Sequence, residues 1–115
     1  MRIFKISILI LTAFSFQIIE AQESNLKNIK KLTFGGDNAE AYFSPNGKML
    51  TLQVTNPDKG IPCDQIYSLD ITQQNIDFNS LKLTSTGKGR TTCSYFMPDG
   101  KHIIYASTQI GRAHV

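Results

Sequence analysis

Short segments with alternating apolar and polar positions dominate the chain after residue 30. Over 49–55 the side chains of Leu50, Leu52 and Val54 fall on one face of an extended chain, with polar side chains between them. This period of two predicts a strand with one face in a core. Related patterns, separated by Gly, Pro and Asn, predict further strands over 30–33, 39–44, 65–71, 81–84, 92–96 and 102–108. The chain is therefore predicted to be all-β.

One stretch of the sequence occurs twice, as YFSPNGK at 42–48 and as YFMPDGK at 95–101. The offset is 53 residues between Pro45 and Pro98, and 51 between Leu32 and Leu83. Four short strands in about 50 residues is the period of a β-propeller blade. The repeats are expected at about 30–80 and 81–109.

The repeated stretch predicts a three-residue hairpin turn in each copy. Proline presets φ at the first turn position, Asn or Asp suits the second, and glycine takes the left-handed position. The turn residues are Pro45, Asn46, Gly47, Pro98, Asp99 and Gly100. We interpret them as structural and not as a binding site.

The repeat resembles the WD40-like propeller repeat (PD40) of TolB-like exported proteins. In each copy the likeness begins with Leu-Thr, at 32–33 and 83–84, and continues with a short loop and an aromatic strand. It ends with Ser-Pro-Asn-Gly-Lys at 44–48 and with Pro-Asp-Gly-Lys at 98–101. The resemblance implies an incomplete propeller over 30–109, because a ring needs at least four blades. It would contain one outer strand (30–33), one full four-stranded blade (39–84) and half of the next (92–108). TolB's additional α/β domain has no counterpart here, so its envelope role does not transfer.

Residues 1–21 have the order of a secretory signal peptide. A cationic start containing Arg2 and Lys5 precedes fourteen uncharged residues, 6–19, and small Ala21 marks the expected cleavage point, with Ser15 as the alternative. The run is shorter than the ~20 residues that a spanning helix needs; a buried N-terminal helix is the competing interpretation. We expect export to the periplasm or the medium, and a flexible lead-in over 22–29.

The last six residues, 110–115, have neither strand periodicity nor likeness to the repeat. They resemble the translation of a sequencing-library adapter. We interpret them as a non-native tail and place the end of genuine sequence near Gln109.

Charge excludes one class of partner. The formal charge is +3, and without Arg2, Lys5 and Glu20 of the leader it falls to +2, from 10 basic and 8 acidic residues. These residues are scattered, whereas nucleic-acid binding needs a basic patch or stripe.

Cys63 and Cys93 are the two cysteines, and an even number in an exported chain favours a structural disulfide between them. Propeller loops of the two types that carry them lie on the same face, which agrees with that pairing. Two free thiols are the alternative. A nucleophilic pair of Cys93 with His102 is disfavoured, because the sequence supplies no third group to orient it.

Lys88 and Arg90 lie in a Gly-rich segment that has the composition of a phosphate loop but not its spacing or its following helix. We expect solvated side chains there, with contact to an anionic group of a partner as the alternative. The sequence contains no calcium-loop, zinc-ligand or serine-hydrolase motif. We therefore predict no catalytic site, metal or cofactor.

These observations favour an exported, non-catalytic propeller that binds a protein, peptide or glycan in the cell envelope. One alternative is the propeller portion of an envelope hydrolase or peptidase whose catalytic domain lies outside this sequence. A third possibility is an independent small β-domain.

Overall fold

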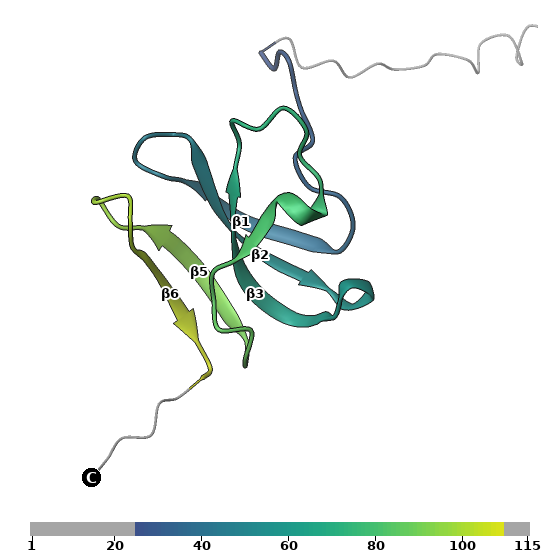
Figure 1. Cartoon of the computed structure of the whole chain (residues 1–115), viewed down its shortest axis with the longest axis vertical. Coiled ribbons are helices and arrows are strands. Elements are labelled where there is room, and N and C mark those ends of the chain that lie inside the picture. The colour runs from purple at the N-terminus through teal and green to yellow at the C-terminus, as the bar shows by residue number, and fades with distance from the viewer. Residues whose placement is uncertain (1–24, 110–115) are drawn as a thin grey trace, which may run out of the picture.

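The computed structural model describes residues 25–109, so the predicted signal peptide, the start of the lead-in and the predicted tail lie outside the described residues. Six strands and two short 3₁₀ helices make up the fold (Figure 1). In chain order they are β1 (Asp37–Phe43), β2 (Met49–Asn56), η1 (Pro57–Lys59), β3 (Ile61–Asp70), η2 (Phe78–Ser80), β4 (Leu81–Leu83), β5 (Thr91–Phe96) and β6 (Ile103–Ser107).

Strands β1 to β4 form one antiparallel sheet in the order β1-β2-β3-β4, and β5 pairs with β6 in a second sheet. Figure 1 shows the β5–β6 hairpin beside the larger sheet, and hydrogen bonds from β2 and β3 to β5 join the two. The all-β prediction is confirmed, and each sheet is built from chain neighbours, as short connections favour.

The two hairpins β1–β2 and β5–β6 have the same register at an offset of 53 residues. Tyr95 pairs with Ile104 as Tyr42 pairs with Thr51, and the other three partner pairs of β5–β6 likewise match pairs of β1–β2. Both first strands also contain a bulge at the same place, where two residues oppose one. The repeat is therefore a structural unit, and its bulge was not predicted from the sequence.

Both copies form the predicted turn between their strands, but hydrogen bonds from Ser44 to Met49 and from Met97 to His102 leave four residues in each turn instead of three. The N–H of Gly47 donates to the carbonyl of Ser44 (2.8 Å), and that of Gly100 donates to the carbonyl of Met97 (2.9 Å). Both glycines have positive φ, 67° and 65°. The Asn46 side chain closes the turn by accepting the N–H of Lys48 at 3.0 Å.

Asp99 replaces Asn46 in the second turn and makes it sensitive to pH. Its carboxylate lies 2.5 Å from Nδ1 of His102 and accepts the N–H of Lys101 at 2.8 Å. These bonds, the His102 bond first, lower the pKa of Asp99 from 3.8 to about 2. Ionised Asp99 therefore stabilises the turn fully above about pH 4, and this contribution is lost as the pH falls through about 2.

We expect carboxyl titration by NMR to place the pKa of Asp99 near 2. Asp99→Asn should keep the turn, since Asn46 already closes the first one, while removing this titration from the acid limb of stability. A midpoint near 3.8 in the folded protein would contradict the pairing.

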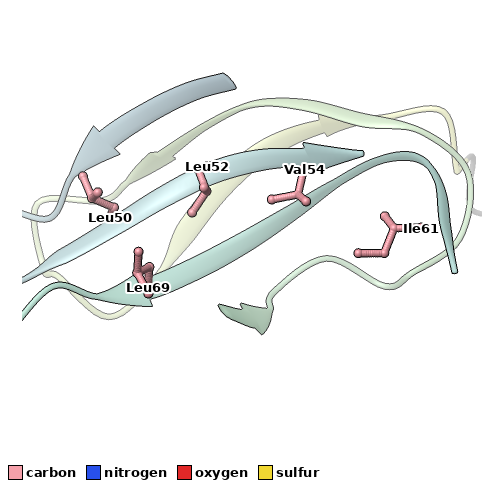
Figure 2. Close-up of a cluster of buried hydrophobic side chains, with 5 residues drawn as sticks. All are labelled: Leu50, Leu52, Val54, Ile61 and Leu69. Atoms are coloured by element: carbon pink, nitrogen blue, oxygen red, sulfur yellow. The ribbon is translucent and has the colours of Figure 1, made fainter. Parts of the chain in front are cut away.

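A cluster of aliphatic side chains on one face of the larger sheet forms the core. Figure 2 shows its buried members, Leu50, Leu52, Val54, Ile61 and Leu69. Three of them alternate along β2, as the period of two predicted, and cross-strand pairing of Leu50 with Leu69 joins β2 to β3. Partly buried Ile76 and Phe78, from the segment between β3 and β4, pack against this cluster.

Strand β3 begins four residues before its predicted start at Gln65. Pro62 lies in this added part of the strand, although proline has no N–H for a sheet ladder. In the structure, 62–64 form an irregularity between the pairs Asn56–Ile61 and Val54–Gln65, so no ladder bond requires that N–H. Helix η1 and left-handed Gly60 (φ 74°) make the short connection that starts the strand early.

The predicted outer strand over 30–33 is wrong, because the structure contains no strand there. Its counterpart in the repeat, β4, is a strand because it pairs with β3 through Leu81 and Leu83. Among the described residues, 30–33 have no such ladder partner. Leu32 instead packs against the core cluster.

Candidate functional site

Buried polar side chains form part of the contact between the two sheets. Thr51 and Ser94, both almost completely buried, share a hydrogen bond of 2.7 Å between their hydroxyl oxygens. The Thr91 hydroxyl donates to the carbonyl of Asp64 at 3.1 Å. Buried hydrogen bonds of this kind fix orientation, because each partner left alone would lose its only compensation for desolvation.

Arg90, expected to be solvated or to contact an anionic group of a partner, forms an ion pair within the chain. Its Nε lies 3.5 Å from Oδ2 of Asp64, whose other carboxylate oxygen accepts the hydroxyl of Thr55. The ion pair therefore connects the segment before β5 to β3. Lys88 is exposed on the same segment.

A groove of about 410 Å³ lies between the start of β3 and the segment 84–90; we call it the loop groove. Most of its surface is apolar, and the side chains of Ile61, Tyr67 and Leu83 contribute to it. It is lined by Gly60, Ile61, Pro62, Cys63, Gln65, Tyr67, Leu83, Gly87 and Gly89. Lys88 lies between Gly87 and Gly89 of the lining, so the segment for which partner contact was the alternative interpretation borders this groove.

A buried polar network holds the wall of the loop groove in place. Gln65 donates from Nε2 to the carbonyl of Gly89 (2.7 Å) and accepts the hydroxyl of Ser85 on Oε1 (2.8 Å). The Ser85 hydroxyl oxygen also accepts the N–H of Ile66 at 3.0 Å. Because both Gln65 and Ser85 are buried, this network makes the groove a preformed feature.

The two cysteines are free thiols in the structure, which differs from the expected disulfide. Cys63 is half-buried and lines the loop groove, whereas Cys93 is exposed in the bulge of β5. The two thiols belong to different surfaces: Cys63 lines the loop groove with Gln65 and Tyr67, whose cross-strand partners Val54 and Leu52 belong to the core cluster, whereas Cys93 belongs to β5, which contacts the opposite face through Thr51. Loops on one face of a propeller can bring two cysteines near each other, but whether the thiols meet depends on which face of its strand each side chain occupies.

We expect both thiols to react with iodoacetamide without reductant, Cys93 faster because it is more exposed. Intact-mass measurement of the native protein over time would show two sequential additions. A protein that becomes alkylated only after reduction would contradict the free thiols, and Cys63→Ser identifies which addition belongs to which residue.

Strands β1 and β5 bring together a cluster of side chains that was not predicted from the sequence. The rings of Tyr42 and Tyr95 lie 4.3 Å apart between centroids, and a side-chain hydrogen bond with Tyr95 is the main cause that raises the pKa of Tyr42 to about 12. Glu40 and Cys93, at the two bulges, both have positive φ, 47° and 51°. In the sequence, the sign of this cluster was the constant offset of 53 residues, which relates Tyr42 to Tyr95 and Glu40 to Cys93.

Cys93 and His102 do not form a nucleophilic pair in the structure. His102 pairs with Asp99 at one end of the hairpin, whereas Cys93 lies in the bulge between the pairs Thr92–Ala106 and Tyr95–Ile104. Within 25–109, no group of three or more His, Cys, Asp or Glu side chains is placed to hold a metal ion. No helix in this described part is long and apolar enough to cross a membrane.

The chain matches no protein-family model, no curated protein and no solved structure. The likeness of its repeat to TolB-like proteins therefore rests on the sequence pattern.

Proposed function

We propose that the two sheets are successive blades of an exported TolB-like β-propeller that serves as a non-catalytic binding module in the cell envelope. The observation that carries this proposal is the repetition of one hairpin at an offset of 53 residues, with the same register, turn and bulge. Equivalent tyrosines of the two copies, Tyr42 and Tyr95, contact each other with their rings tilted by 39°, as neighbouring blades could place them. Two hairpins with the same pattern that did not pack against each other would not favour the blade interpretation.

The loop groove is the binding site in this proposal. Its apolar lining, including Tyr67 and Leu83, accommodates an apolar side chain, and its lining residues follow β3 from Ile61 to Tyr67, beside which an extended peptide segment could lie. Lys88 at the border adds a positive charge for an acidic neighbour of that side chain. The groove is already shaped before binding, so little ordering of the protein opposes association.

Binding of the chain to arrays of acidic-apolar peptides and of glycans tests this function. We expect the chain to bind some of the peptides. Leu83→Lys should weaken this binding at least about tenfold, because the charge would enter the apolar groove. Ile29→Lys is the matched control, since Ile29 is 77 % exposed and lies outside the groove. Equal loss in both variants, or glycan signals alone, would overturn the peptide assignment; cleavage of the bound peptide would favour a catalytic role instead.

A further inference from the structure

Asn46 and Gly47 form the one Asn-Gly pair of the sequence, and they lie in the turn of the first hairpin. Asn46 is exposed to solvent. Asparagine before glycine is the pair most prone to deamidation, because glycine has no side chain to hinder the approach of its amide nitrogen to the asparagine side chain. The pair is therefore a candidate modification site that needs only water as co-reactant.

The reaction begins when the amide nitrogen of Gly47 loses its proton to solvent base and attacks Cγ of Asn46. A C–N bond forms, the Cγ–Nδ2 bond breaks, and Nδ2 takes a proton from water and leaves as ammonia, so that a cyclic imide remains. Water then opens the imide. Opening at Cγ gives aspartate, whereas opening at the backbone carbonyl gives isoaspartate, which has an additional carbon in the main chain.

The folded turn holds both reacting groups in hydrogen bonds. The N–H of Gly47 donates to the carbonyl of Ser44 at 2.8 Å. Oδ1 of Asn46 accepts the N–H of Lys48 at 3.0 Å and the hydroxyl of Ser44 at 2.8 Å. Ser44 is only 5 % exposed, and its hydroxyl oxygen accepts the N–H of Met49 at 2.9 Å. Attack on Cγ therefore requires the turn to open first, as exchange of the same amide proton does.

The second hairpin shows that the fold accepts aspartate at this position. Asp99 is the equivalent of Asn46, and its carboxylate accepts the N–H of Lys101 at 2.8 Å as Asn46 accepts that of Lys48. Isoaspartate differs, because its additional main-chain carbon changes the spacing that the hydrogen bond across the turn needs. The two products of the reaction thus have different consequences for the first hairpin.

We propose that Asn46 is a deamidation site that the folded turn blocks and that unfolding exposes. The folded chain keeps its asparagine. Each period in the unfolded state converts part of the chains to aspartate, which refold, and part to isoaspartate, which do not close the first hairpin. The modification therefore leaves a permanent record of unfolding. Asn46 and Gly47 do not line the loop groove, so this result is independent of peptide binding.

Incubation of the native chain, and of the same chain in urea at equal pH and temperature, tests the proposal. Peptide mapping by mass spectrometry and chromatography separates the asparagine, aspartate and isoaspartate forms at position 46. We expect the asparagine form to disappear at least about tenfold more slowly from the folded chain, because its hydrogen bonds must break before attack. Equal rates in the two samples would overturn the proposal.

Two variants test the hydrogen bonds and the product. Ser44→Ala removes one bond to Oδ1, so the folded variant should deamidate about threefold faster or more, while Ser107→Ala, at an exposed serine of β6, should match the original chain. Asn46→Asp should fold with the circular dichroism spectrum and urea midpoint of the original chain. An unchanged rate in folded Ser44→Ala would overturn the role of the hydroxyl, and failure of Asn46→Asp to fold would overturn the refolding of the aspartate form.

Discussion

Gly36→Ala is expected to lower the free energy of unfolding by about 2–4 kcal/mol. Gly36 has φ 66°, and a Cβ there would stand 2.3 Å from the carbonyl oxygen of Thr55 and 2.7 Å from Cβ of Asn56. The first distance involves backbone, which cannot rotate away as a side-chain end can. The substitution therefore adds a clash across the β1–β2 hairpin to the ordinary strain of left-handed alanine.

Gly47→Ala separates those two effects. Gly47 has nearly the same φ, 67°, but a Cβ there would meet nothing within 4 Å. Only the backbone strain remains, so we expect a loss of about 1–2 kcal/mol. Urea unfolding followed by circular dichroism measures both variants, and equal losses would show that Gly36 does not approach Thr55 closely.

The second repeat offers the same test with a smaller expected loss. Gly89 is equivalent to Gly36 and has φ 67°, but the nearest atom to its Cβ position is the Thr108 hydroxyl oxygen at 2.8 Å. A hydroxyl can turn aside more readily than a carbonyl. Gly89→Ala should therefore fall between the other two variants in the same urea measurement.

The turns and most strands followed from the sequence because their causes are local. Pro45, Asn46 and Gly47 each supply a conformation that one particular turn position needs, and the alternating side chains of β2 need only one apolar side to be read. The strand over 30–33 was wrongly predicted for the opposite reason. A strand needs a hydrogen-bonded partner strand, and the sequence of a four-residue segment does not show whether a distant segment will pair with it.

The candidate site was predictable only in part. The sequence identified the segment with Lys88 and Arg90, which borders the loop groove, but it could not show that Asp64 already binds Arg90. Which way a side chain points depends on strand phase, and the irregularity at 62–64 resets that phase for Cys63. The bulges at Glu40 and Cys93 could not be predicted, because positive φ is usually found at glycine and neither residue is a glycine.

Packing of the second hairpin on the first sheet depends most on one apolar side chain. Ile66 is fully buried and is the cross-strand partner of Gln53, so it lies on the face of Thr51, toward β5, and not with the core cluster. Around it the contact consists of hydroxyl groups, the Asp64 carboxylate and the ring pair of Tyr42 and Tyr95. Since polar contacts contribute little net free energy, burial of Ile66 supplies much of the attraction between the two sheets.

Ile66→Ala is therefore expected to lower the free energy of unfolding by about 2–5 kcal/mol, through lost burial and the cavity left behind. Amide hydrogen exchange should also become faster across β5 and β6, because their packing surface is lost. Ile104→Ala is the matched control, an isoleucine in a strand but 59 % exposed, and should cost less than about 1 kcal/mol. A small effect of Ile66→Ala, or faster exchange confined to β2 and β3, would mean that the second hairpin is held by its polar contacts to Thr51 and Asp64 and by the ring contact of Tyr95 with Tyr42.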